Sequence, residues 1–272
     1  MHTTSREAFG RARDELEGLT RDADASTLQT VGDELSSVAD VLADHLDLRR
    51  HLVDPAVYED GRVEVLHNLL QSKVESSTLD VLTTLVRARV STSTDLVEAV
   101  EDLGRDALLA SAEKADTLSE VEDELFRFGR LLEREQRLRT LLSDTTTEAS
   151  RRRELLDSVL ADRVDAVTHR LLTQMITRRQ ARPLDRTAEV LAEAAAARRD
   201  RSIARVVSPV VLGERQESRL AESLSTLYGR RISVHVDVDP DILGGLVVRV
   251  GGEVIDGSIV GRMRSAANAR PS

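Results

Sequence analysis

The sequence predicts a mostly α-helical protein with a small α/β tail: two duplicated helical bundles followed by a C-terminal β-α-β-β-α unit. Apolar residues make up 40% of the 272 positions but aromatic ones only 2%, so the cores must consist of Leu, Val and Ala, which suits helix-on-helix packing. The sequence also matches itself at a shift of about 90 residues. Finally, eight of the 14 glycines lie at or after Gly213, where strand-like patterns begin.

The internal repeat defines the helical region. STLQTVGDEL at 26–35 aligns with DTLSEVEDEL at 116–125, and RVEVLHNLL at 62–70 aligns with RRELLDSVL at 152–160. A shared helical period would preserve apolar positions, but it would not keep charged residues such as Asp33, Glu34, Arg62 and Glu64 in register. We therefore predict a duplication, with an extra first bundle at 1–93 and a second bundle at 94–202.

Helical spacing is clearest in the second copy. Apolar residues recur there three or four positions apart, at Val121, Leu125, Phe128, Leu132, Leu156, Leu160, Leu171, Leu172, Met175 and Ile176. Pro183 is expected to end one helix, and the alanine-rich segment 188–200 to form the next. Phe126, Phe128 and Met175 could be read as a ligand-binding group, but we interpret them as core residues.

The tail, predicted as a domain over 203–266, changes character. IARVVSPVV is expected to be a strand broken by Pro209, and the following helix places Leu220, Leu224 and Leu227 on one face. RISVHVDVD alternates as a half-buried strand does, whereas LVVRV is continuously apolar, as in a central strand. Gly251 begins a tight turn, and the last helix is expected to start at Asp256 or Ser258. Residues 267–272 are expected to be a disordered tail.

Charge and composition exclude several classes of function. The net charge is −10, and residues 1–120 carry 25 acidic against 12 basic side chains. Such an acidic chain is a poor general binder of nucleic acid. The absence of cysteine excludes disulfides and thiolate metal sites. No apolar run approaches the length of a membrane-spanning helix, and the N-terminus has no signal-peptide core, so a cytoplasmic location is the default expectation.

Sequence motifs predict neither catalysis nor a cofactor. A phosphate-binding P-loop needs Lys-Ser or Lys-Thr, but Lys73 and Lys114 precede other residues. The glycine pairs do not form a dinucleotide-binding pattern, GSIVG is not a nucleophile elbow, and the six histidines lack metal-ligand spacing. We therefore expect no catalytic residue, no cofactor and no metal. The remaining motif is expected to shape the chain for docking, through Gly244, Gly245, Gly251, Asp256, Gly257 and Ser258.

This tail closely resembles the δ subunit of bacterial F-type ATP synthases, whose mitochondrial equivalent is the oligomycin sensitivity-conferring protein. The family pattern is met in order and spacing by Asp239, Ile242, Gly244, Gly245, Val247, Val248, Val250, Gly251, Ile255, Asp256, Gly257 and Ser258. Gly213 and Gly252 depart from the usual residues. Family members usually have one bundle, so the resemblance says little about the first copy, which we expect to pack as an independent bundle against another stalk element.

The resemblance implies a noncatalytic stator subunit at the cytoplasmic face of the cell membrane, attached only through the complex. In this family the bundle receives the N-terminal helices of the catalytic-head α subunits, and the C-terminal part meets the C-terminal end of the stalk b subunit. By analogy, the groove lies between the first and fifth helices of the second bundle, near Leu96, Val100, Leu171 and Met175, although ordinary core packing explains these residues equally well. The alternative function is a free helical regulatory adaptor unrelated to ATP synthase.

Overall fold

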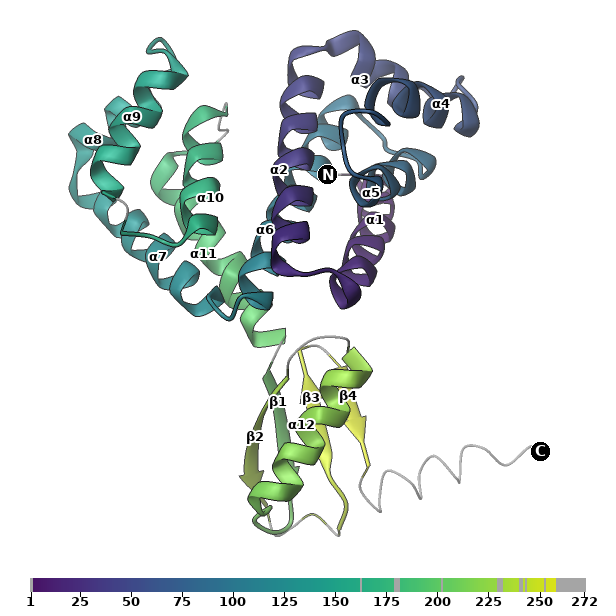
Figure 1. Ribbon diagram of the computed structural model, residues 1–272, viewed down its shortest axis with the longest axis vertical. Helices are drawn as coiled ribbons and strands as arrows, with labels where there is room; N and C mark the ends of the chain where they lie inside the picture. Colours follow the sequence, from purple (N-terminus) through teal and green to yellow (C-terminus); the bar gives the residue numbers. More distant parts are fainter. Residues whose placement is uncertain are drawn as a thin grey trace. The chain divides into compact units, whose positions relative to one another are not determined.

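The computed structural model describes residues 2–161, 163–178, 182–201, 203–228, 232–239, 242, 244–251 and 253–257. Over these residues the chain forms twelve helices and four strands, so the predicted mostly helical class with a small sheet near the C-terminus is confirmed. The chain divides into two compact units, at 1–195 and 196–272. Figure 1 labels their elements.

The helical unit contains eleven helices in its described part. The first six are α1 (Thr3–Asp22), α2 (Ala25–Asp44), α3 (Leu46–Val53), α4 (Glu59–Leu70), α5 (Ser76–Arg87) and α6 (Ser93–Lys114). The next five are α7 (Leu118–Arg134), α8 (Gln136–Ser143), α9 (Ala149–Leu160), α10 (Ala166–Thr177) and α11 (Leu184–Arg201), whose end enters the second unit. The bounds of α3, α4 and α5 recur 90 residues later in α8, α9 and α10.

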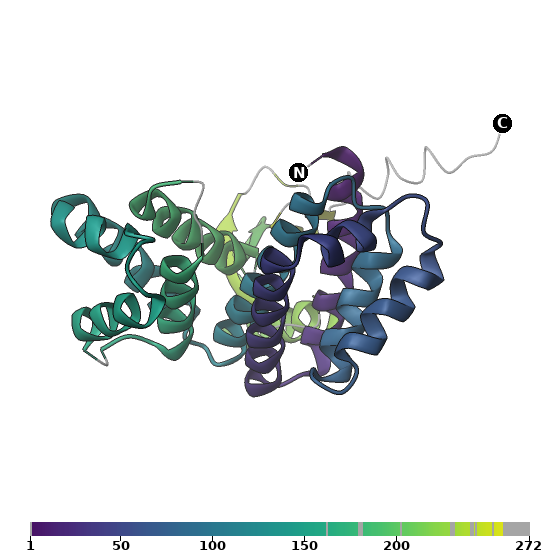
Figure 2. The same ribbon diagram turned by 90° about the horizontal axis from the view of Figure 1, so that it is seen from above.

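Helix α6 contributes to two hydrophobic cores. Leu96, Val100 and Leu103 pack with buried residues of α1, α2 and α5, whereas Leu108 and Leu109 pack with buried residues of α7 to α11. Figures 1 and 2 show the helices before α6 gathered on one side of it and those after α6 on the other. The first bundle is therefore not closed by itself, because the helix that completes its core also belongs to the second core.

Local capping explains where several helices begin. The Asp24 carboxylate accepts a hydrogen bond from the Thr27 N–H (2.7 Å) at the start of α2. The Thr92 hydroxyl accepts one from the Asp95 N–H (3.0 Å) at the start of α6. Pro183 precedes α11, and its carbonyl accepts the Thr187 N–H (3.0 Å). The prediction that Pro183 ends the preceding helix is wrong, since α10 already ends at Thr177 and a fixed proline φ suits a helix start.

The second unit is a four-stranded sheet with one helix. Strands β1 (Ile203–Ser208), β2 (Ser233–Val238), β3 (Val247–Val250) and β4 (Glu253–Asp256) follow the order β2-β1-β3-β4, with β1 and β2 parallel and the other pairs antiparallel. Helix α12 (Glu214–Tyr228) lies on one face (Figure 1). The apolar core between them contains Ala204, Val206, Leu224, Ile232, Val248 and Val250.

Four details of the predicted tail and core need correction. The segment after Gly251 is a fourth strand, and Asp256 ends that strand instead of beginning a helix. Ser258 and residues 267–272 lie outside the described residues. Leu227 is 64% exposed because Leu220, Leu224 and Tyr228, four residues apart, form the packed stripe of α12. Phe126 is 56% exposed because it follows the buried Leu125 by one residue, which turns it about 100° away.

Candidate functional site

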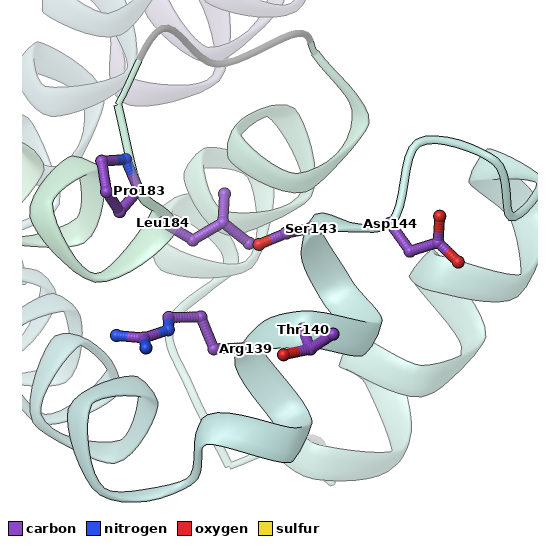
Figure 3. A pocket seen from close by; sticks show the side chains of 6 residues that line it. All are labelled: Arg139, Thr140, Ser143, Asp144, Pro183 and Leu184. Carbon is purple, nitrogen blue, oxygen red and sulfur yellow. The ribbon is translucent and has the colours of Figure 1, made fainter.

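No group of His, Asp or Glu side chains in the described part of the chain is placed to hold a metal ion. A hollow beside α8 is lined by Arg139, Thr140, Ser143, Asp144, Pro183 and Leu184 (Figure 3). Its charged groups are already engaged: Arg139 lies 3.5 Å from Asp185, and Asp144 accepts hydrogen bonds from Thr146 and Thr147. These bonds hold the pKa of Asp144 below its usual value. The hollow therefore offers no acid–base pair, and partner surfaces are the relevant candidates.

The glycine corner near the C-terminus shapes the chain through its backbone. Gly244, Gly245 and Gly251 have φ values of 80°, 85° and 57°, in the left-handed region that favours glycine. A Cβ on Gly257 would lie 3.0 Å from the Leu246 carbonyl oxygen, which accepts the Gly257 N–H at 2.9 Å. The corner therefore brings the start of β3 and the end of β4 into close backbone contact.

The four residues predicted to line a partner groove lie in two different cores. Leu96 and Val100 of α6 are buried in the core that contains residues of α1, α2 and α5. Leu171 and Met175 of α10 are buried in the core that contains residues of α7 to α11. None is more than 3% exposed. The structure therefore brings them together as two separate pairs, and their part in partner binding stays a prediction.

Helix α2 covers α6 at unusually close range. A Cβ built on Gly32 would lie 2.7 Å from Cγ of Leu108 and 3.1 Å from the carbonyl oxygen of Gly104. Ser36 is 5% exposed, and its hydroxyl would lie 3.0 Å from a Cβ on Gly104. Glycine at both positions removes the side chains that would otherwise separate the two helices, so α2 and α6 pack backbone to backbone.

Two arginines, one in α10 and one directly after it, form ion pairs with carboxylates of α2. Arg170 Nε lies 3.0 Å from Asp33, and Arg178 Nε lies 2.8 Å from Asp40. Arg178 also donates to the Ser36 carbonyl oxygen (2.7 Å) and lies 3.8 Å from Glu101 of α6. Burial raises the pKa of Glu101, while the positive charge of Arg178 opposes that rise. One arginine thus connects α10, α2 and α6.

Sequence reasoning did not identify this contact between the two halves. Its signal lies in the positions where the copies differ: Arg170 and Arg178 correspond, 90 residues earlier, to Asp80 and Ala88. Neither positive charge is repeated in the first copy, so the fold that both copies share does not require it. Each charge therefore marks a surface that is specific to the second copy.

Helix α7 exposes an aromatic side chain at a position where α2 buries a polar one. Phe126, the counterpart of the buried Ser36, stands 56% exposed. Two ion pairs flank it, Arg127 with Asp123 at 2.9 Å and Arg130 with Glu133 at 2.5 Å. At this position the equivalent helices therefore bury a polar side chain in one half and expose an aromatic one in the other.

Comparisons with known proteins agree with the motif near the C-terminus. The family model for the ATP synthase delta (OSCP) subunit matches residues 105–269. "ATP synthase subunit delta" of Streptomyces avermitilis is 43% identical over 265 residues, covering 97% of each chain. The corresponding protein of Corynebacterium urealyticum is 42% identical over 265 residues, again 97% of each chain. "ATP synthase subunit b-delta" of a Mycobacterium species (strain KMS) is 40% identical over 271 residues, which span 100% of this chain and 61% of that protein.

Proposed function

The chain belongs to the ATP synthase delta (OSCP) family, and from this premise we propose how its parts connect the peripheral stalk to the catalytic head. It is a noncatalytic stator subunit of an F-type ATP synthase, and it serves ATP synthesis coupled to proton transport. The observation that carries this conclusion is a match to delta subunits over 97% of both chains, which includes the first helical bundle.

We propose that the second bundle receives the N-terminal helices of the catalytic-head α subunits at the α6–α10 pair. Helix α2 packs on α6 and is held to α10 by Arg170 and Arg178, so docking at this place requires α2 to move. Substituting both Asp33 and Asp40 with Asn should loosen α2 and tighten binding of an α-subunit N-terminal peptide. A matched control substitutes the exposed Asp44 and Asp47. Unchanged affinity in D33N/D40N would place the site elsewhere.

We propose that the C-terminal domain, 203–266, meets the C-terminal end of the b subunit. Two observations support this. The mycobacterial relative carries both names, b and delta, in a single chain. In addition, the described part of this unit exposes Val210, Val211, Val238 and Val254, which are apolar side chains suited to an interface.

The complex is associated with a membrane, and we propose that this subunit lies on its cytoplasmic face. None of the described helices has the length and apolarity to cross a bilayer. Attachment to the membrane is therefore proposed to run through partner subunits.

We also propose that residues 1–93 and 94–202 are two copies of one helical unit. Glu34 accepts hydrogen bonds from the Glu75 N–H and the Thr78 hydroxyl, and Glu124 makes the equivalent bonds to Asp165 and Thr168. Arg62 donates to the Arg87 carbonyl oxygen, and Arg152 donates to that of Ile176. Polar contacts that recur about 90 residues apart support descent from one ancestor.

The experiment for the whole proposal mixes purified chain with two peptides of the same organism, one from the N-terminus of the α subunit and one from the C-terminal end of the b subunit. Binding to both is expected, as is copurification of the chain with detergent-solubilised ATP synthase. Failure to bind either peptide, together with absence from the solubilised complex, would overturn the proposed arrangement.

A further inference from the structure

The face of the C-terminal sheet opposite α12 carries a charge pattern that the fold does not explain. Side chains alternate along the strands, so Ala204, Val206, Val248 and Val250 point toward α12 and are buried. Their neighbours point to the opposite face. Arg205, His235, Arg249 and Val254 are exposed there.

Two arginines stand directly opposite one another at the centre of this face. The antiparallel register of β1 and β3 pairs Arg205 with Arg249. Like charges in this arrangement repel and destabilise a sheet. In the described part of the chain no carboxylate forms an ion pair with either arginine. Among the described residues, this repulsive pair on two central strands is therefore not compensated by an ion pair.

The surroundings of the arginines define the shape of a ligand. Arg205 lies beside His235 of β2, and Arg249 lies beside Val254 of β4. The next row along the strands contains Val207 and Val247 at its centre, with Asp237 and Asp256 on the outer strands. The face is therefore cationic at its middle, apolar beside that, and acidic at two outer positions.

We propose that this face binds an amphipathic helix that places two carboxylates, one turn apart, on Arg205 and Arg249. Neighbouring strands are about 4.8 Å apart, and side chains four residues apart on a helix are about 5–6 Å apart, so two such carboxylates reach both guanidinium groups. Apolar residues of the same helix cover Val207 and Val247. The inference rests on the proposed function, and it specifies the surface and chemistry with which the C-terminal domain holds the b subunit.

Charge disfavours the other occupants. Residues 258–272 contain three arginines and no Asp or Glu, so they would add to the repulsion. A second copy of this face would bring one arginine pair against another. An anionic membrane surface is usually held by a cluster of about four to eight basic residues, whereas this face has two arginines with Asp237 and Asp256 nearby.

The test uses the full chain and measures, by calorimetry, its affinity for a peptide from the C-terminal end of the b subunit. R205E/R249E should weaken binding about tenfold or more, since it removes two charge-assisted contacts. R215E/R219E, on the exposed side of α12, makes the same change in net charge and should alter affinity less than about twofold. A peptide whose carboxylates are replaced by amides should bind the wild-type chain as weakly as the native peptide binds R205E/R249E.

The single variant Arg205→Glu separates binding from folding. It creates an opposite-charge pair with Arg249, so it should raise the thermal midpoint by roughly 1–4 °C while it weakens peptide binding. If R205E/R249E binds the peptide as tightly as the wild-type chain does, this inference alone is overturned. A wild-type chain that does not bind the peptide would overturn the proposed b contact as well. If the chain binds anionic vesicles and this binding depends on the two arginines, the face belongs to a membrane and the inference is overturned. If arginine-dependent peptide binding is seen only after the chain is truncated behind Gly257, the face belongs to the chain's own tail, and the inference is equally overturned.

Discussion

Helices α2 and α7 hold corresponding places in the two halves of the helical unit, yet their outer faces differ at the position of Ser36 and Phe126. Each provides a glutamate that binds the start of a later helix, Glu34 for α5 and Glu124 for α10. On the outer face, however, α2 buries Ser36 against α6, whereas α7 exposes Phe126. The repeated part is the part that holds each half together. The divergent part is the surface where one half meets the other or meets solvent.

The largest expected effect comes from removing the first half. Deleting residues 1–92 exposes Leu96, Val100 and Leu103, and each fully buried side chain of this kind contributes roughly 1.5–3 kcal/mol. We expect fragment 93–272 to unfold at a markedly lower temperature and to bind a hydrophobic dye. The same fragment with Leu96 and Val100 changed to Gln should bind less dye. If the monomeric fragment unfolds at the same temperature as the full chain, the second half is stable without the first.

The next effect contrasts a glycine of α2 with a glycine of α7. Gly32→Ala places a Cβ 2.7 Å from Cγ of the buried Leu108, and the overpacking should lower the free energy of unfolding by about 1–3 kcal/mol. Gly129→Ala places its Cβ an ordinary 3.5 Å from Ala188, so the gain in helix propensity should dominate.

Urea unfolding of both variants measures the difference, with Gly10→Ala as a control because its Cβ meets nothing within 4 Å. Equal stability changes at Gly32 and Gly129 would contradict the close packing of α2 on α6.

A third pair of variants tests the repeated contacts. Glu34→Ala and Glu124→Ala each leave a fully buried threonine hydroxyl, that of Thr78 or Thr168, without its acceptor. Each should cost about 1–3 kcal/mol of stability, and the two costs should agree within about 0.5 kcal/mol. Denaturant unfolding provides the measurement, and the exposed Glu15→Ala is the control. A large inequality would mean that the two halves do not share one stabilising design.

The smallest effect concerns Glu101 of α6, which lies beside Arg178 at the contact between the two halves. Its folded pKa is raised by burial, so the folded protein holds this proton more tightly than the unfolded chain does. Burying the charged form therefore costs stability above that folded pKa, and the cost disappears as the pH falls through it. Glu101→Gln should therefore raise stability at pH 7.

The advantage of Glu101→Gln should vanish near pH 4, where wild-type Glu101 is protonated. Thermal unfolding of both proteins across this pH range provides the check. An advantage that instead grows on acidification would contradict the sign of the shift.

Much of the fold could be predicted because it depends on local pattern. The repeat in register predicted corresponding helices, alternation predicted β2, and a continuous apolar run predicted the central position of β3. Local pattern was insufficient for Phe126 and Leu227, because apolar character does not say which face a neighbour covers. The part of the candidate residues in partner binding stays a prediction. Leu96 and Leu171 were placed beside one groove, but they lie in separate cores.

The sequence by itself determined the helical class, the 90-residue repeat and the glycine positions that require a left-handed backbone. These follow from spacing and from the conformational freedom of single residues. Only the tertiary structure decided that α6 serves two cores and that Arg178 joins three helices. It also set Arg205 against Arg249. The reason is physical: periodicity is a property of one segment, whereas burial and pairing depend on which distant segment packs against it.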